Sequence, residues 1–124
     1  MQLTAGLIRK KEYDKAIQIC DAAIKESNDP STLANAWLNK GDALMAQKHA
    51  DTALLAYLHV PIFYSDETSF VPPAILGSAR AYVRLDDNIR AKKALNELIA
   101  SFPKSAEAAI AQSELKKIES PKPN

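Results

Sequence analysis

The chain has 124 residues, of which 47% are hydrophobic and 25% are charged, with 16 basic and 15 acidic side chains. This length suits one domain with a buried core, and the balanced charge argues against a surface built to bind nucleic acid. No apolar run reaches the roughly 18 residues that span a bilayer, so membrane insertion is not expected. A single cysteine excludes an internal disulfide and any metal site built on cysteine pairs.

Seven segments with apolar residues at helical spacing follow one another along the chain, separated by prolines and short polar stretches. Asp29-Pro30 has the form of an N-cap followed by a proline in the first turn. The predicted helices cover residues 2–10, 12–27, 30–47, 49–63, a segment from Pro72, 87–102, and a last segment from Ser105 to residue 119. We therefore predict an all-α fold in which short loops make neighbouring helices antiparallel.

Small residues recur along these helices at a fixed period. Ala16, Ala53 and Ala91 are 37 and 38 residues apart, and each of the last two follows another small residue, Gly41 or Ala79, by twelve positions. Ser113 comes 22 residues after Ala91 and is expected to continue the series. Such a period is typical of stacked helix pairs that approach closely at small side chains.

With these residues in place, the sequence resembles the tetratricopeptide repeat family, whose signature places a tryptophan, a small residue and an aromatic at set distances. The middle repeat supplies Trp37, Gly41, Leu44, Ala53 and Tyr57; the third supplies Ile75, Ala79, Tyr82, Ala91, Leu95 and Pro103; the first supplies Ala16, Cys20 and Ala23. The resemblance implies a right-handed superhelical stack of about three repeats plus a C-terminal capping helix. It implies one domain over 1–119. Residues 120–124 are polar and contain prolines, which predicts a disordered tail.

The first two junctions are longer than a 34-residue unit implies. The step from Ala16 to Gly41 is 25 residues and that from Ala53 to Ala79 is 26, against 22 from Ala91 to Ser113. We expect lengthened second helices or loops there. Because the first repeat lacks most of its first helix, we also expect the chain to be a fragment of a longer protein. Residues 102–109 are similar to junctions in bacterial envelope repeat proteins such as the Tol-Pal coordinator, which favours a periplasmic or envelope location.

The resemblance implies a concave groove lined by the first helix of each pair, which binds a protein or peptide partner and catalyses no reaction. The candidate groove residues, mapped from the family, are Arg9, Asn35, Asn39, Asp42, Arg80 and Arg84. The alternative is an architectural segment that spaces other domains or forms a homodimer through the ends of the stack. The family's clamp for chaperone tails matches only at Asn39, so such tails are not the expected ligand.

Other reactive residues have ordinary explanations. Cys20 lies on a predicted buried stripe and is expected to fill the core. His49 and His59 are ten residues apart on one helix, about 80° out of phase, so they cannot share one metal ion. No motif for catalysis, metal binding or a cofactor is present. Residues 60–73, rich in proline and aromatic side chains, are either a packing plug over the long junction or a partner-binding patch.

Overall fold

The computed structural model describes residues 2–119, and the side chains of residues 4–119. Seven α-helices occupy this part of the chain, and it contains no strand, which confirms the all-α prediction. The helices are α1 (Gln2–Arg9), α2 (Tyr13–Glu26), α3 (Pro30–Ala46), α4 (Ala50–Phe63), α5 (Val71–Arg84), α6 (Asn88–Ser101) and α7 (Ala106–Glu119). Observed ends lie within about one residue of those predicted. The predicted tail at 120–124 lies outside the described residues.

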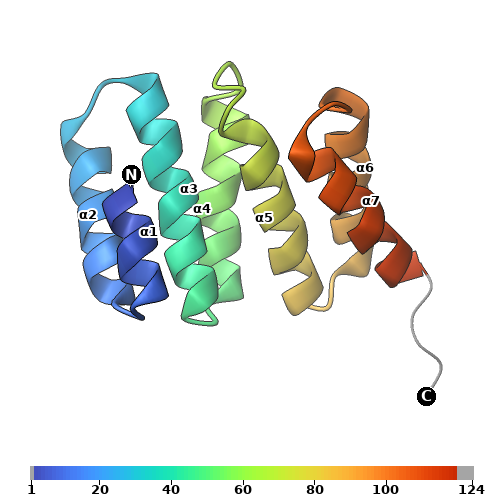
Figure 1. The fold of residues 1–124 in the computed structure, drawn as a ribbon, viewed down its shortest axis with the longest axis horizontal. Helices are drawn as coiled ribbons and strands as arrows, with labels where there is room; N and C mark the ends of the chain where they lie inside the picture. Colours follow the sequence, from blue (N-terminus) through green and yellow to red (C-terminus); the bar gives the residue numbers. More distant parts are fainter. Residues whose placement is uncertain (1, 120–124) are drawn as a thin grey trace.

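The helices stack as antiparallel pairs in two layers (Figure 1). Each helix packs on the next one in the chain, and the first helices α1, α3, α5 and α7 also contact one another in sequence. Within residues 2–119, the backbones of the second helices α2, α4 and α6 make no contact with one another. The first-helix layer is therefore the tightly packed side of a helix-pair solenoid, and the second-helix layer is its open side.

Hydrogen bonds from side chains fix several helix starts. The backbone N–H and the hydroxyl of Thr32 both donate to Asp29, over 3.0 and 2.8 Å, and Pro30 takes the first helical position as predicted. Asp87 accepts from the backbone N–H of Arg90 at the start of α6. Ser105 accepts from the backbone N–H of Ala108 at the start of α7. These caps satisfy N–H groups that have no partner inside their own helices.

The turn inside each helix pair repeats as faithfully as the small residues do. Lys11, Lys48 and Asp86 have φ angles of 61°, 67° and 60°, and they stand 37 and 38 positions apart, the same spacing as the repeat alanines. At the second turn the Lys48 N–H donates to the Met45 carbonyl and the His49 N–H to the Leu44 carbonyl. This is the Schellman arrangement, which normally places glycine at the left-handed position.

The small residues lie where helices meet. Ala16, Gly41, Ala53, Ala79 and Ala91 are all buried, as predicted. The Tyr57 ring of α4 lies against two glycines on opposite neighbours: a Cβ added to Gly41 would come 2.7 Å from the ring, and one added to Gly77 would come 2.5 Å from it. In the next unit Leu95 takes the place of Tyr57, and it packs with Ala79 and Ala111.

Two expectations are corrected. Ser113 is exposed, because within residues 2–119 no further helix follows α7 to cover it. The second helices α2, α4 and α6 are not lengthened, since each has 14 residues. The first junction instead adds a turn to the start of α3, which has 17 residues and begins eleven positions before Gly41, whereas α5 begins eight before Ala79. The second junction does use a longer loop, residues 64–70.

Residues 60–73 divide between packing and exposure. Tyr64 and Phe70 pack against a core formed by Val60, Val71 and neighbouring alanines, so they act as the predicted plug. Phe63 does not join them, because it is 67% exposed. The aromatic junction therefore closes the core below it and leaves one large ring in solvent.

Candidate functional site

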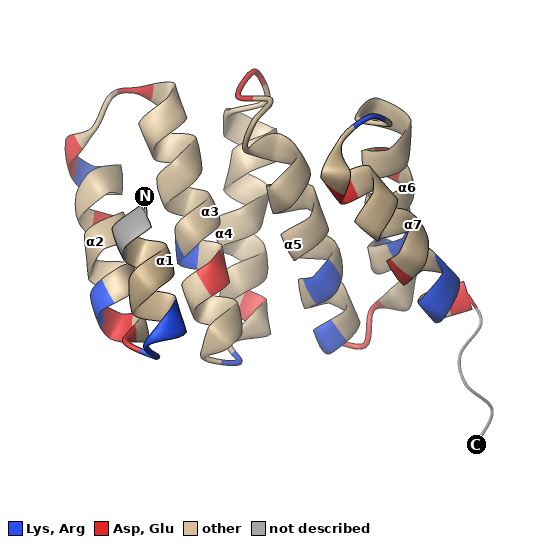
Figure 2. Ribbon diagram, viewed as in Figure 1, with Lys and Arg blue, Asp and Glu red and all other residues tan. Residues whose placement is uncertain are grey.

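The charged residues of the first-helix layer gather toward one end of the helices (Figure 2). The upper half of this layer is mostly uncharged, and the lower half of α5 carries two basic residues. Among the predicted groove residues, Arg9, Asp42, Arg80 and Arg84 are exposed, whereas Asn35 and Asn39 are half-buried. The two ends of the first-helix layer therefore differ in the number of charged side chains that they offer to a ligand.

Asn35 and Asn39 are occupied with each other. The Asn39 amide Nδ2 donates to the Asn35 carbonyl and to Asn35 Oδ1, each over 2.7 Å. Arg9 stands at the end of α1 with no ion pair among the described residues. No hydrogen bond or ion pair among the described residues joins Arg9 to these asparagines, which use part of their own hydrogen-bonding capacity within α3.

Asp42 connects the first-helix layer to the core. Its Oδ1 accepts a 2.6 Å hydrogen bond from the hydroxyl of the buried Tyr57. Asp42 is exposed at its outer edge, but the loss of water around its inner side raises the pKa of the carboxyl, against the lowering effects of the Tyr57 hydroxyl and the Arg80 charge. Burial, and next the Asp42 charge, raise the pKa of Tyr57, so the phenol stays a donor.

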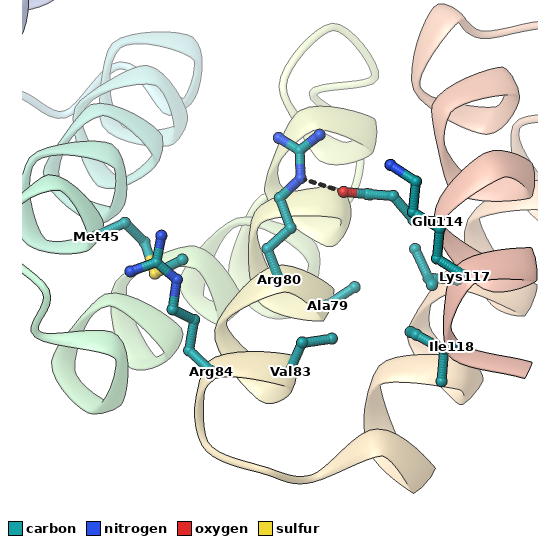
Figure 3. Close-up of a pocket in the computed structure, with 9 residues that line it drawn as sticks. Met45, Ala79, Arg80, Val83, Arg84, Glu114, Lys117 and Ile118 are labelled. Atoms are coloured by element: carbon teal, nitrogen blue, oxygen red, sulfur yellow. Dashed lines mark hydrogen bonds and ion pairs between the residues drawn. The ribbon is translucent and has the colours of Figure 1, made fainter. Parts of the chain in front are cut away.

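Arg80 and Arg84 line one groove, which α3, α5 and α7 form above a floor from α6. Arg80 Nε donates to Glu114 Oε1 over 2.7 Å, and Figure 3 shows this pair reaching from α5 to α7. The cavity has a volume of about 280 Å³. Its wall and floor residues are Met45, Ala79, Arg80, Val83, Arg84, Leu95, Glu114, Lys117 and Ile118. Val83 and Ile118 face each other across the gap between α5 and α7 (Figure 3).

The groove holds polar groups that the fold does not use. Glu114 Oε2 is buried and has no hydrogen-bond partner among the described residues. Neither Arg84 nor Lys117 forms an ion pair within residues 4–119. These three groups surround an apolar floor. A ligand with a hydrogen-bond donor, a negative charge and an apolar group could therefore bind there.

Sequence reasoning missed the α7 side of this groove. Lys117 and Ile118 follow Glu114 by three and four residues, which places both of them beside it on one helix face. That spacing is a usable signal, but the family resemblance predicts only a capping helix for this segment. Met45 and Val83 carry no comparable signal, since an apolar residue at either position fits an ordinary core stripe.

The remaining candidate residues behave as structural groups. Cys20 is fully buried, and its burial raises the pKa of the thiol to about 11, which makes it a poor nucleophile. His59 stacks on Trp37 with ring centroids 3.7 Å apart, a role that the sequence did not indicate. No group of three or more potential metal-binding side chains occurs in the described part of the chain. No helix within it has the length and apolar character that crossing a membrane requires.

Comparison with protein families matches residues 73–105 to the tetratricopeptide repeat. Comparison with curated proteins gives no match. The matched segment contains nearly all of α5 and the whole of α6, including Ala79 and Ala91. The helix pairs before it repeat the same small residues and the same left-handed turn at the same period. The chain therefore carries a tetratricopeptide repeat at residues 73–105, and repeats of this kind suggest a protein–protein interaction module.

Proposed function

We propose that the chain is a non-enzymatic scaffold that binds a peptide segment of a partner protein in the groove of its first-helix layer. The observation that carries this proposal is the α3–α5–α7 groove, where an apolar floor lies beside two cations without ion pairs and a buried carboxylate oxygen without a donor. A polypeptide contains groups that can pair with each of these three, namely carboxylates for the cations and backbone N–H groups for the carboxylate oxygen. A rigid helical groove also loses little conformational freedom when it binds an extended segment.

The side chains that line the groove predict which groups the bound peptide presents to it. A backbone N–H donates to Glu114 Oε2, an acidic side chain pairs with Arg84 and Lys117, and an apolar side chain covers Val83 and Ile118. The cavity of about 280 Å³ is smaller than most sites for whole small molecules and suits one or two side chains. Arg9, Asn35, Asn39 and Asp42 stay predicted contacts of a longer ligand.

Selection from a phage-displayed random peptide library tests this proposal. We expect enriched peptides that combine apolar and acidic residues, and an affinity at least about tenfold lower for Arg84→Glu and Lys117→Glu, since each variant reverses a charge. Lys25→Glu is the matched control, because it reverses an exposed charge on α2, outside the groove. If no peptide is enriched, or if the control weakens binding as much as the groove variants, the groove is not a peptide site.

The architectural alternative has one observation in its favour. Ile110 is 41% exposed on α7, and Ser113, three residues later on the same face, is exposed as well. A second copy stacked end to end would cover both residues, as α6 covers Ala79 on α5. Sedimentation equilibrium tests this possibility: a dimer that Ile110→Lys dissociates would support self-association, and a monomer at all concentrations would contradict it.

A further inference from the structure

The outward side of α4 is apolar and exposed. Leu55, Ile62 and Phe63 have exposed fractions of 62%, 63% and 67%. At 100° per residue these three side chains and His59 fall within an arc of about 100°, opposite the arc that packs on α3 and α5. A helix with apolar residues all round is normally buried all round. On this side of α4 nothing in the described part of the chain covers them.

The flanking repeats show that the fold does not require apolar residues at these positions. The positions that hold Leu55, Ile62 and Phe63 are two, nine and ten residues after the repeat alanine. The same positions hold Gln18, Lys25 and Glu26 in α2, and Lys93, Ala100 and Ser101 in α6, and all six of these residues are exposed. Among the described repeats, only the middle one has large apolar side chains at these three positions, so the packing of the fold does not explain them.

Aromatic stacking gives one edge of this surface a fixed shape. His59 lies parallel to Trp37, with an interplanar angle of 6°, and its Nδ1 is 2.8 Å from the Leu55 carbonyl oxygen. Phe63 approaches the other side of His59 at 5.5 Å between ring centroids. The Lys40 ammonium lies 5.3 Å from the Trp37 ring, held by an ion pair with Asp21. An ordered apolar edge requires little rearrangement when a partner docks.

The opposite edge of this surface descends into a second cavity, of about 260 Å³, between α4 and α6 above α5. Leu58 and Pro61 form its α4 wall, and Arg90, Lys93 and Glu97 stand on its α6 wall. Arg90 is paired with Asp87, whereas Lys93 and Glu97 form no ion pair within residues 4–119, so Lys93 is the basic side chain of the α6 wall that can pair with an acidic ligand. The second helices do not contact one another, which leaves the channel open along its length.

We infer that this outer surface, made of Leu55, Leu58, Ile62 and Phe63 on α4 with Arg90 and Lys93 on α6, docks an amphipathic helix of a partner protein. The helix lays its apolar stripe on α4 and turns a flank of acidic residues toward α6. Such a helix adds a member to the second-helix layer and removes the exposed apolar area from water. This site is on the opposite layer from the first-helix groove, so the inference does not depend on the proposed function.

A pair of synthetic peptides tests the inference. Both are fluorescein-labelled 16-residue helices with leucines at steps of three and four; one carries glutamates along one flank, and the other carries lysines at the same places. Fluorescence anisotropy should show at least about tenfold tighter binding of the acidic peptide. The emission of Trp37, which is the chain's single tryptophan, should change as the unlabelled acidic peptide binds beside His59.

The main test variant copies onto α4 residues that another repeat of the chain has at the same positions. Leu55→Gln, Ile62→Lys and Phe63→Glu together give α4 the residues that α2 carries at the same positions, so the variant should fold and should lose at least about tenfold in affinity. Lys93→Glu should reduce or reverse the preference for the acidic peptide. Lys25→Glu is the matched control, because it reverses an exposed charge on α2, away from both the first-helix groove and this outer surface, and it should leave binding unchanged.

Three results would overturn the inference. The first is equal binding of the acidic and basic peptides. The second is undiminished binding by the triple variant, with its helical circular dichroism intact. The third is a concentration-dependent dimer of the unmodified chain that Ile62→Lys dissociates, which would assign this surface to a second copy of the chain instead of a different protein.

Discussion

Replacing either glycine beside Tyr57 by alanine should destabilise the fold, although the same change normally stabilises a helix. In a helix interior Gly→Ala gains about 1 kcal/mol. Here the new Cβ would lie 2.7 Å from the ring at Gly41 and 2.5 Å at Gly77. The ring is only 3% exposed, Asp42 holds its hydroxyl, and each glycine blocks the movement that would relieve the contact at the other.

Overpacking of this kind costs about 1–3 kcal/mol, and the upper end applies because the ring cannot move aside. After the helical gain is subtracted, we expect each variant to lose about 2 kcal/mol. For a chain of this length that corresponds to a fall in Tm of about 8 °C. Urea unfolding followed by circular dichroism measures the free energy, and thermal unfolding provides an independent check.

Two controls isolate the contact. Gly6→Ala should be neutral or stabilising, because its Cβ would meet only the end of the Arg9 side chain, at 3.9 Å. In a Tyr57→Leu background, Gly77→Ala should no longer destabilise, since the next unit already combines Leu95 with alanines. If Gly41→Ala and Gly77→Ala unfold at or above the temperature of the unmodified chain, the explanation of these glycines is wrong.

Three further predictions concern single side chains. Lys48→Gly should stabilise the fold by about 1 kcal/mol in urea unfolding, because it relieves a left-handed residue, whereas Lys93→Gly inside α6 should cost about the same amount. Asp42→Asn keeps an oxygen for the Tyr57 hydroxyl. The pKa of Asp42 in the folded chain is raised above 3.8, so ionisation of this carboxyl opposes folding. The variant should therefore gain stability relative to the unmodified chain as the pH rises from 3.8. Equal dependence of the two stabilities on pH would contradict this prediction. Cys20 should react with a thiol reagent only as fast as the protein unfolds, and rapid reaction of the native protein would show that the thiol is accessible.

The sequence predicted the helices well because their signals are local. Apolar spacing, the Asp29-Pro30 cap and the period of Ala16, Ala53 and Ala91 each depend on residues close together in the chain. The prediction of a longer second helix or loop at the first junction was wrong for a related reason. A helix can grow by one turn at either end with the same apolar pattern, and only packing decides that α3 begins early.

The candidate site was harder to predict because it depends on pairs that are distant in sequence. Arg80 meets Glu114 across 34 positions, and Tyr57 meets Asp42 across 15. Neither pair has a spacing rule that a single sequence reveals. The outer surface of α4 was missed for another reason: Leu55 and Ile62 match an ordinary core stripe, and their exposure emerges only when α4 is seen to have neighbours on one side alone.

In the part of the chain that the structure describes, the first helices contact one another in sequence, whereas the second helices do not. Neighbouring helix pairs can therefore rotate relative to each other about the contacts between their first helices. Because the second helices lie farther from these contacts, a rotation between neighbouring helix pairs changes the spacing of the second helices more than that of the first helices. A helix inserted between α4 and α6 would act as a wedge and narrow the opposite hollow. Any two ligands held on the two layers must then alter each other's affinity by the same factor.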